Sequence, residues 1–165
     1  MLLARRTHNV LSGLALCLLC QFVLHSRTVV AVEHPGAEAV VNRLRSGKEP
    51  LRRAAIPLVE WNQGHDEEYL AALDELIATS LRRPALDSAF VAVQKLADCP
   101  LSAASEAVAR ALPATDWRLS MQAIEVLGQR RADDFATAIR KIWDRPEAQR
   151  YYALRHSVVC SLGDI

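Results

Sequence analysis

The sequence predicts an all-α fold in which pairs of helices stack as a solenoid. Residues 88–96, 120–127 and 155–162 share one helical pattern, and the last two of these segments end in Leu-Gly. Their closing leucines are 31 and 35 residues apart, and each follows Ala92, Ala123 or Val158 by four positions. A looser copy places Ala55 four residues before Val59, and Val59 lies 37 residues before Leu96. A period in the thirties is typical of stacked helical pairs, and the abundant alanine agrees with an all-α fold.

Turn residues divide the first half of the chain into the expected elements. Residues 36–45 form a short first helix that ends at Ser-Gly. Pro50 suits the first turn of a helix that runs to about residue 61 with Leu51 facing inward, and Pro57 should kink that helix. The acidic run after His65 begins the next helix, which ends before Pro84.

The second half repeats this arrangement. We expect helices over residues 85–96 and 101–112. Asp116 should cap a helix over residues 117–127, and Gly128 should close it in the manner of a C-terminal glycine. A partner helix follows over residues 133–142. The sequence Asp-Arg-Pro-Glu at residues 144–147 resembles a capping box and begins a last helix that runs to about residue 162.

These blocks resemble HEAT repeats, particularly the short HEAT-like variety whose first helix ends in Ala-x-x-x-Leu-Gly-Asp. The matching segments are residues 123–128 (AIEVLG) and 158–164 (VVCSLGD). The resemblance covers residues 48–165 and implies a right-handed superhelix of about three to four antiparallel helix pairs, with the last repeat incomplete. The Leu-Gly-Asp triplet is complete only once, and armadillo and tetratricopeptide repeats remain alternatives.

The N-terminal residues are typical of a signal peptide. Arg5 and Arg6 precede a fifteen-residue apolar stretch over residues 10–24, and small residues before Val32 offer a cleavage site. Because about 20 apolar residues are needed to span a bilayer, an uncleaved signal anchor is the weaker alternative. The sequence therefore predicts a signal peptide over residues 1–31, a short helix within residues 32–47, and a periplasmic, extracellular or envelope protein with no membrane span in the mature chain.

The sequence after the predicted signal peptide contains few residues that indicate catalysis, metal binding or a charged partner. From Val32 it carries 17 Lys and Arg against 19 Asp and Glu, which gives no electrostatic reason to expect nucleic acid as a partner. The sequence indicates no catalytic residue, metal site or cofactor. His65 beside three acidic residues reads as a helix start, and His156 as a half-buried packing residue. Cys99 and Cys160 should lie too far apart for a disulfide, with Cys160 exposed.

The main functional hypothesis is a scaffold that binds another protein. In HEAT-like folds the second helix of each pair usually lines the concave side. After Gly163-Asp164 no second helix follows, so the sequence favours a fragment of a longer solenoid, and docking at the C-terminal edge is the alternative. The alternative is a lyase-type or enzyme-assisting repeat protein that modifies a partner through Cys160 or His156. The three tryptophans should pack at helix ends or, as an alternative, form a binding ridge. The candidate partner-binding residues are Glu68, Asp74, Glu75, Ser105, Glu106, Arg110, Asp134, Arg140 and Lys141.

Overall fold

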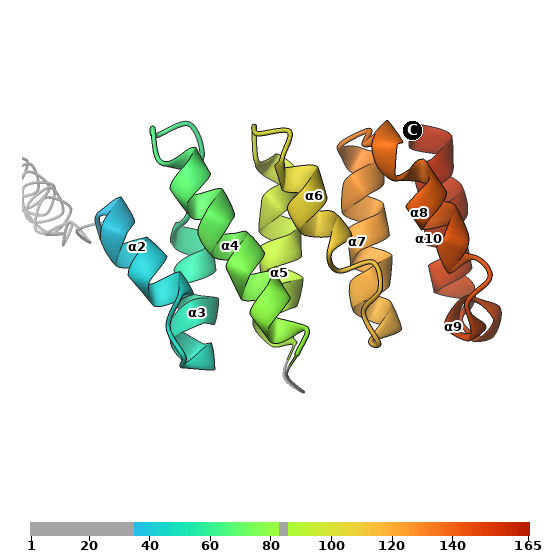
Figure 1. Ribbon diagram of the computed structural model, residues 1–165, viewed down its shortest axis with the longest axis horizontal. Coiled ribbons are helices and arrows are strands. Elements are labelled where there is room, and N and C mark those ends of the chain that lie inside the picture. Colours follow the sequence, from blue (N-terminus) through green and yellow to red (C-terminus); the bar gives the residue numbers. More distant parts are fainter. Residues whose placement is uncertain (1–34, 83–85) are drawn as a thin grey trace, which may run out of the picture. The chain divides into compact units, whose positions relative to one another are not determined.

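A computed structural model describes residues 35–82 and 86–165, and over these residues the chain is helical with no strand (Figure 1). The predicted signal peptide lies outside the described residues. The α-helices are α2 (Ala37–Leu44), α3 (Glu49–Ala55), α4 (Asp66–Ser80), α5 (Asp87–Lys95), α6 (Ala104–Ala109), α7 (Trp117–Gln129), α8 (Ala136–Ile142), α9 (Pro146–Arg150) and α10 (Tyr152–Asp164). Three short 3₁₀ helices join them: η1 (Ile56–Leu58), η2 (Leu96–Asp98) and η3 (Asp133–Phe135).

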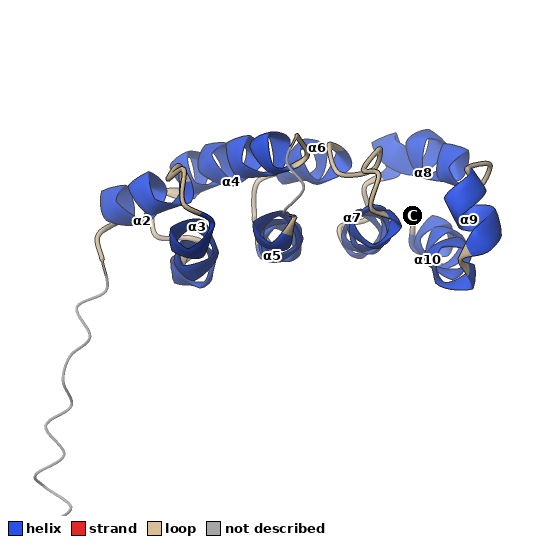
Figure 2. Cartoon of the chain, turned by 90° about the horizontal axis from the view of Figure 1, so that it is seen from below, coloured by secondary structure: helices blue, strands red, loops and turns tan. Residues whose placement is uncertain are grey.

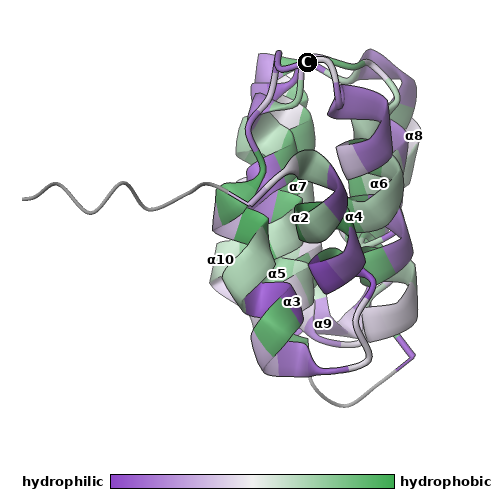
Figure 3. Cartoon of the chain, turned by 90° about the vertical axis from the view of Figure 1, so that its left-hand side faces the viewer, coloured by the Kyte–Doolittle hydropathy of each residue, from purple (hydrophilic) through white to green (hydrophobic). Residues whose placement is uncertain are grey.

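Within residues 35–165 the helices form two layers. One layer contains α3, α5, α7 and α10, each in contact with the next. The other contains α2, α4, α6 and α8, and α4 contacts both α2 and α6. Figure 2 shows the two layers in cross-section, and Figure 3 shows them from the side, with hydrophobic segments in green. The all-α prediction is confirmed.

The repeated apolar positions form the centre of the core. Ala55, Ala92 and Ala123 are completely buried, and Val158 is 1% exposed. Of the residues four positions later, Val59, Leu96 and Leu127 are completely buried, whereas Leu162 is half-buried. An alanine or valine at the first position keeps neighbouring helices close, and the larger residue one turn later fills the space between the layers.

Two of the expected helices are interrupted, and the helix expected over residues 101–112 spans only Ala104–Ala109. Pro57 lies in η1 directly after α3, so the helix expected to continue to residue 61 ends at Ala55, and Leu51 is exposed rather than inward. A proline lacks the N–H that the helix would need at this point. The last helix is also divided, because Tyr151 is extended (φ −111°, ψ 108°) between α9 and α10. Its ring stacks on that of Trp117 at a centroid distance of 4.4 Å.

Gly128 has a packing function and does not end its helix. α7 continues to Gln129, and the residue with a positive φ that follows is Arg131 (φ 51°). A Cβ added to Gly128 would lie 2.8 Å from the Cβ of Ser161 on α10. Real Cβ atoms do not approach so closely, so glycine is needed here for the contact between α7 and α10. By contrast, Asp116 caps α7 as predicted and accepts a hydrogen bond from the Arg118 amide.

Two arginines bind carbonyl groups at helix ends in the preceding helix pair. The Arg130 guanidinium donates to the carbonyl oxygens of Leu96, Cys99 and Leu101 at 2.9, 2.7 and 2.7 Å, and to that of Ala97 at 3.3 Å. The Arg145 guanidinium donates to Leu112 and Ala114, both at 3.0 Å. The Leu96 and Leu101 carbonyls also accept from nearby amides, and those of Leu112 and Ala114 also accept from the Ser120 hydroxyl. The two guanidinium groups therefore add strong donors at helix ends, where carbonyls lack partners within their own helix.

A carboxylate performs the corresponding role at one helix start. The Ser88 amide at the beginning of α5 donates to Glu49 at 2.8 Å, and Arg52 donates to the other oxygen of the same carboxyl group. Burial opposes ionisation of Glu49, but the hydrogen bonds from Arg52 and Ser88 outweigh it and hold the pKa below its ordinary value. Arg52 is 4% exposed, and Glu49 is the counterion that makes its burial tolerable.

Replacement of Arg145 should destabilise the protein. The Arg145→Met variant keeps most of the aliphatic stem but leaves the single hydroxyl proton of Ser120 to serve both the Leu112 and the Ala114 carbonyl, so we expect the free energy of unfolding to fall by about 2 kcal/mol. Urea unfolding followed by circular dichroism measures this. Arg140→Met, at an exposed arginine, is the control and should change stability by less than about 0.5 kcal/mol. Equal stability of the two variants would contradict this role of Arg145.

Addition of a methyl group at Gly128 should separate α7 from α10. We expect Gly128→Ala to lower the free energy of unfolding by about 1–3 kcal/mol, because the new Cβ meets Ser161. Gly163→Ala is the matched control, since no atom of another helix lies within 4 Å of its Cβ position. In a double-mutant cycle, Ser161→Gly should recover part of the loss caused by Gly128→Ala. Strictly additive effects of the two substitutions would argue against the contact.

Candidate partner-binding surface

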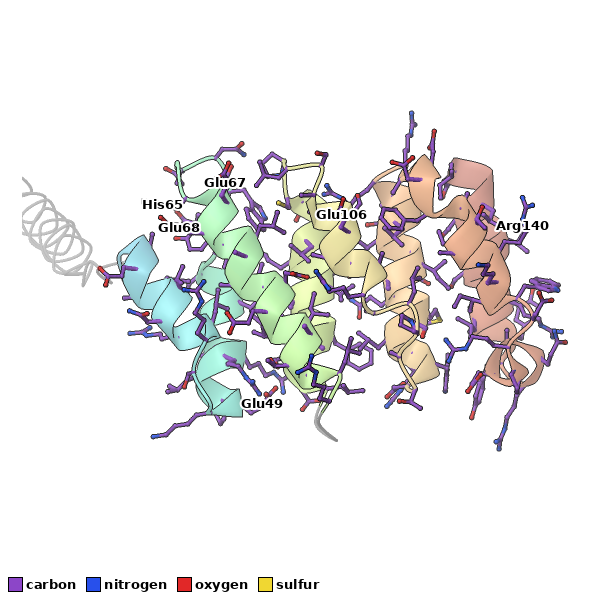
Figure 4. The ribbon with its side chains drawn as sticks, in the orientation of Figure 1. Glu49, His65, Glu67, Glu68, Glu106 and Arg140 are labelled. Carbon is purple, nitrogen blue, oxygen red and sulfur yellow. The ribbon has the colours of Figure 1, made fainter. Side chains whose placement is uncertain are left out.

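The nine residues predicted from the sequence lie in the layer formed by α2, α4, α6 and α8, or in the turns that join this layer to the other. Figure 4 labels Glu68 on α4, Glu106 on α6 and Arg140 on α8. All nine are exposed or half-buried. They are, in chain order, Glu68, Asp74 and Glu75 on α4, Ser105 and Glu106 on α6, Arg110 directly after α6, Asp134 in η3, and Arg140 and Lys141 on α8.

Several of the nine bind one another or a neighbouring helix. Arg110 Nε lies 2.5 Å from Asp74 Oδ1, which joins the end of α6 to α4. Arg45, directly after α2, lies 3.1 Å from Glu75 on α4. Ser105 accepts a hydrogen bond from Arg130 at 3.0 Å. These contacts join neighbouring helices, and they leave Glu68, Glu106, Asp134, Arg140 and Lys141 as the predicted residues without such a contact in the described chain.

Grooves separate the helices of this layer. The α4–α6 groove has a volume of about 440 Å³, and a second groove of about 590 Å³ lies between α6 and η3. A third, also of about 590 Å³, lies between α2 and α4. Glu106 borders the first two. The α4–α6 groove is lined by Glu67, Leu70, Ala71, Asp74, Leu101, Ser102, Ala103, Glu106, Ala107 and Arg110.

Sequence reasoning did not identify the floor of the α4–α6 groove. It assigned Glu67 only to the start of a helix and did not select Leu70 or Ala71, although residues 67, 70, 71 and 74 share one face at helical spacing. That periodicity was the available signal. Helical periodicity could not predict that Leu101 and Ala103 line the groove, because these residues lie in the turn that precedes α6.

The residues considered for chemistry do not border these three grooves. His65 borders a hollow beside the start of α4, and its Nδ1 lies 3.5 Å from a carboxylate oxygen of Glu68. His156 is exposed rather than half-buried. Both of its ring nitrogens lie 3.7 Å from the sulfur of Cys160, one helical turn further on.

The cysteines and tryptophans differ in burial. Cys99 and Cys160 are both free, and only Cys160 is exposed, as the sequence predicted. Burial raises the pKa of the Cys99 thiol above its ordinary value. Trp61 donates to the Lys95 carbonyl at 3.3 Å, Trp117 stacks on Tyr151, and Trp143 is 40% exposed. Packing at helix ends therefore accounts for the first two tryptophans.

Comparisons with known proteins identify no relative. No family model matches the chain, and no curated protein or solved structure matches it. Over residues 35–82 and 86–165, no helix is both long and apolar enough to cross a membrane. In the same part of the chain, no three His, Cys, Asp or Glu side chains gather closely enough to hold a metal ion.

The two free cysteines should differ in reactivity. We expect a maleimide to modify Cys160 at least about a hundredfold faster than Cys99, because Cys99 is buried and its thiol ionises with more difficulty. Mass spectrometry of peptides containing single cysteines reads each rate separately. The difference should disappear in denaturant. Similar rates in the native protein would contradict the burial of Cys99.

Proposed function

We propose that this chain is an exported HEAT-like repeat protein that acts as a scaffold for protein–protein interaction. The observation that carries the proposal is the α4–α6 groove, whose floor is apolar and whose border bears charged groups. Apolar pockets that bear a few polar groups at their edges are typical of binding sites. The nine residues selected from the sequence lie on or beside the layer that contains this groove.

The solenoid arrangement is part of the proposal. Its support is the recurrence of buried Ala55, Ala92, Ala123 and Val158 at one position of successive segments. The contacts from α3 to α5, α7 and α10 follow chain order, as expected when each helix pair contacts mainly its neighbours. Export rests on the signal-peptide pattern over residues 1–31 alone, so it is proposed from the sequence.

A second candidate function is lyase-type or enzyme-assisting modification of a partner. Its support is the position of exposed Cys160 beside His156, since a neighbouring imidazole can take the proton of a thiol. This function predicts that Cys160→Ser abolishes modification of the partner and leaves the fold intact. A scaffold tolerates the same substitution.

Charge reversal on the grooved layer should weaken partner binding. We expect the Glu106→Lys, Asp134→Lys variant to lose the protein that the wild-type chain enriches from its own envelope or secreted fraction, because both residues border the groove between α6 and η3. Quantitative mass spectrometry of the enriched proteins measures this. The loss should be at least about tenfold for two interfacial charges.

The control carries the same change of net charge elsewhere. Glu60→Lys, Asp144→Lys alters two exposed carboxylates in turns, neither of which borders a groove described above. It should enrich the same protein as the wild type. If the wild-type chain enriches no protein, or if both variants retain it equally, the proposal that this layer binds a partner is wrong.

A further inference from the structure

The α4–α6 groove has an apolar floor made largely of small side chains. Ala71, Ala103 and Ala107 leave space between the helices, and Leu70 and Leu101 supply larger apolar surface. Ala71 and Ala103 are exposed, whereas Ala107 is 3% exposed. Apolar side chains of a partner could therefore enter the groove without displacing a residue of the core. The inference below rests on the proposed scaffold function and specifies the partner.

The border of the groove is acidic. It contains three carboxylates, from Glu67, Asp74 and Glu106, and one guanidinium, from Arg110, which give a net charge of −2 at neutral pH. Asp74 is neutralised by Arg110. Glu67 and Glu106 form no ion pair within the described residues. Figure 4 shows Glu67 near the beginning of α4 and Glu106 on α6.

The negative charge continues past one end of the groove. A hollow of about 330 Å³ beside the start of α4 shares Glu67 and Leu101 with the groove and is also bordered by Asp66 and Glu68. Asp66 is occupied by a hydrogen bond from the Asn62 amide at 2.8 Å. A nucleic acid or an anionic membrane would meet like charge along this path, whereas lysine or arginine side chains would be attracted to it.

We propose that the α4–α6 groove binds a basic amphipathic segment of the partner protein. Apolar side chains of this segment contact the floor at Ala71 and Ala103, and its lysine or arginine side chains pair with Glu67 and Glu106. The apolar contact supplies affinity, and the carboxylates supply specificity for charge. The apolar contact and the charge pairing can be tested separately, because different residues provide them.

The test uses the full chain and a fluorescein-labelled peptide of four Lys-Leu-Ala repeats, measured by fluorescence anisotropy. We expect saturable binding that weakens between 50 and 300 mM salt, conditions that shorten the screening length from about 14 to about 6 Å. A peptide with glutamate in place of every lysine should not bind. Glu67→Gln, Glu106→Gln should weaken binding about fivefold, as two exposed charge pairs allow. Glu60→Gln, Asp144→Gln removes the same charge outside the groove and should bind as the wild type does.

Obstruction of the floor provides an independent variant. Ala71→Arg places a long cation in the groove and should reduce binding at least about tenfold, whereas Ala39→Arg places the same side chain at an exposed position of α2 outside the groove. Circular dichroism melting of each variant shows that the fold is retained. Equal binding of the peptide to Ala71→Arg and Ala39→Arg overturns the inference, as does equal binding of the two peptides.

Enrichment of the natural partner by the same variants shows whether the groove assignment or the broader scaffold proposal has failed. A natural partner that is lost on reversal of Glu106 and Asp134 but binds Ala71→Arg normally overturns the groove assignment and leaves the scaffold intact. Absence of any natural partner overturns the scaffold, and the inference that depends on it then fails as well. Loss of that partner from Ala71→Arg, together with selective binding of the basic peptide, supports both.

Discussion

The structure depends on hydrogen bonds by which one helix pair completes the helix ends of the preceding pair. Arg130, directly after α7, binds carbonyl groups in the turn between α5 and α6. Arg145 does the same for the turn between α6 and α7. α6 has six residues, and an isolated helix of that length is not stable in water. Contacts from the next pair therefore supply much of the order in these turns.

Contacts between helices also determine which charges remain free on the candidate partner-binding surface. Asp74, Glu75 and Arg110 form ion pairs that set the distances between α2, α4 and α6. Exposed ion pairs contribute little stability, but they occupy these charges and remove them from the set that can meet a partner. What remains in the α4–α6 groove is an apolar floor and two carboxylates, Glu67 and Glu106. The chemistry of the surface follows from which charges the fold has already paired.

The sequence predicted the features that depend on local spacing. The all-α class, the buried positions at Ala92 and Ala123, and the Asp116 cap all follow from helical periodicity or from one side chain near its own main chain. Features that depend on distant segments were not predictable. Gly128 looked like a helix end because glycine often follows the last residue of a helix. Its packing role was not visible, because the residue that it contacts, Ser161, lies 33 residues further along the chain. The predicted binding residues lie in or beside one layer, but periodicity could not show that four of them, Asp74, Glu75, Ser105 and Arg110, bind residues of neighbouring helices.

The most direct test of the account is amide hydrogen exchange of the Arg130→Met variant, read residue by residue by NMR. If Arg130 completes the turn before α6, exchange should accelerate about tenfold or more over residues 97–112, while α2 and α3 keep their wild-type protection. Unchanged exchange over residues 97–112 would contradict the role assigned to Arg130. Uniform acceleration over the whole chain would contradict the claim that each helix pair is completed locally by the next.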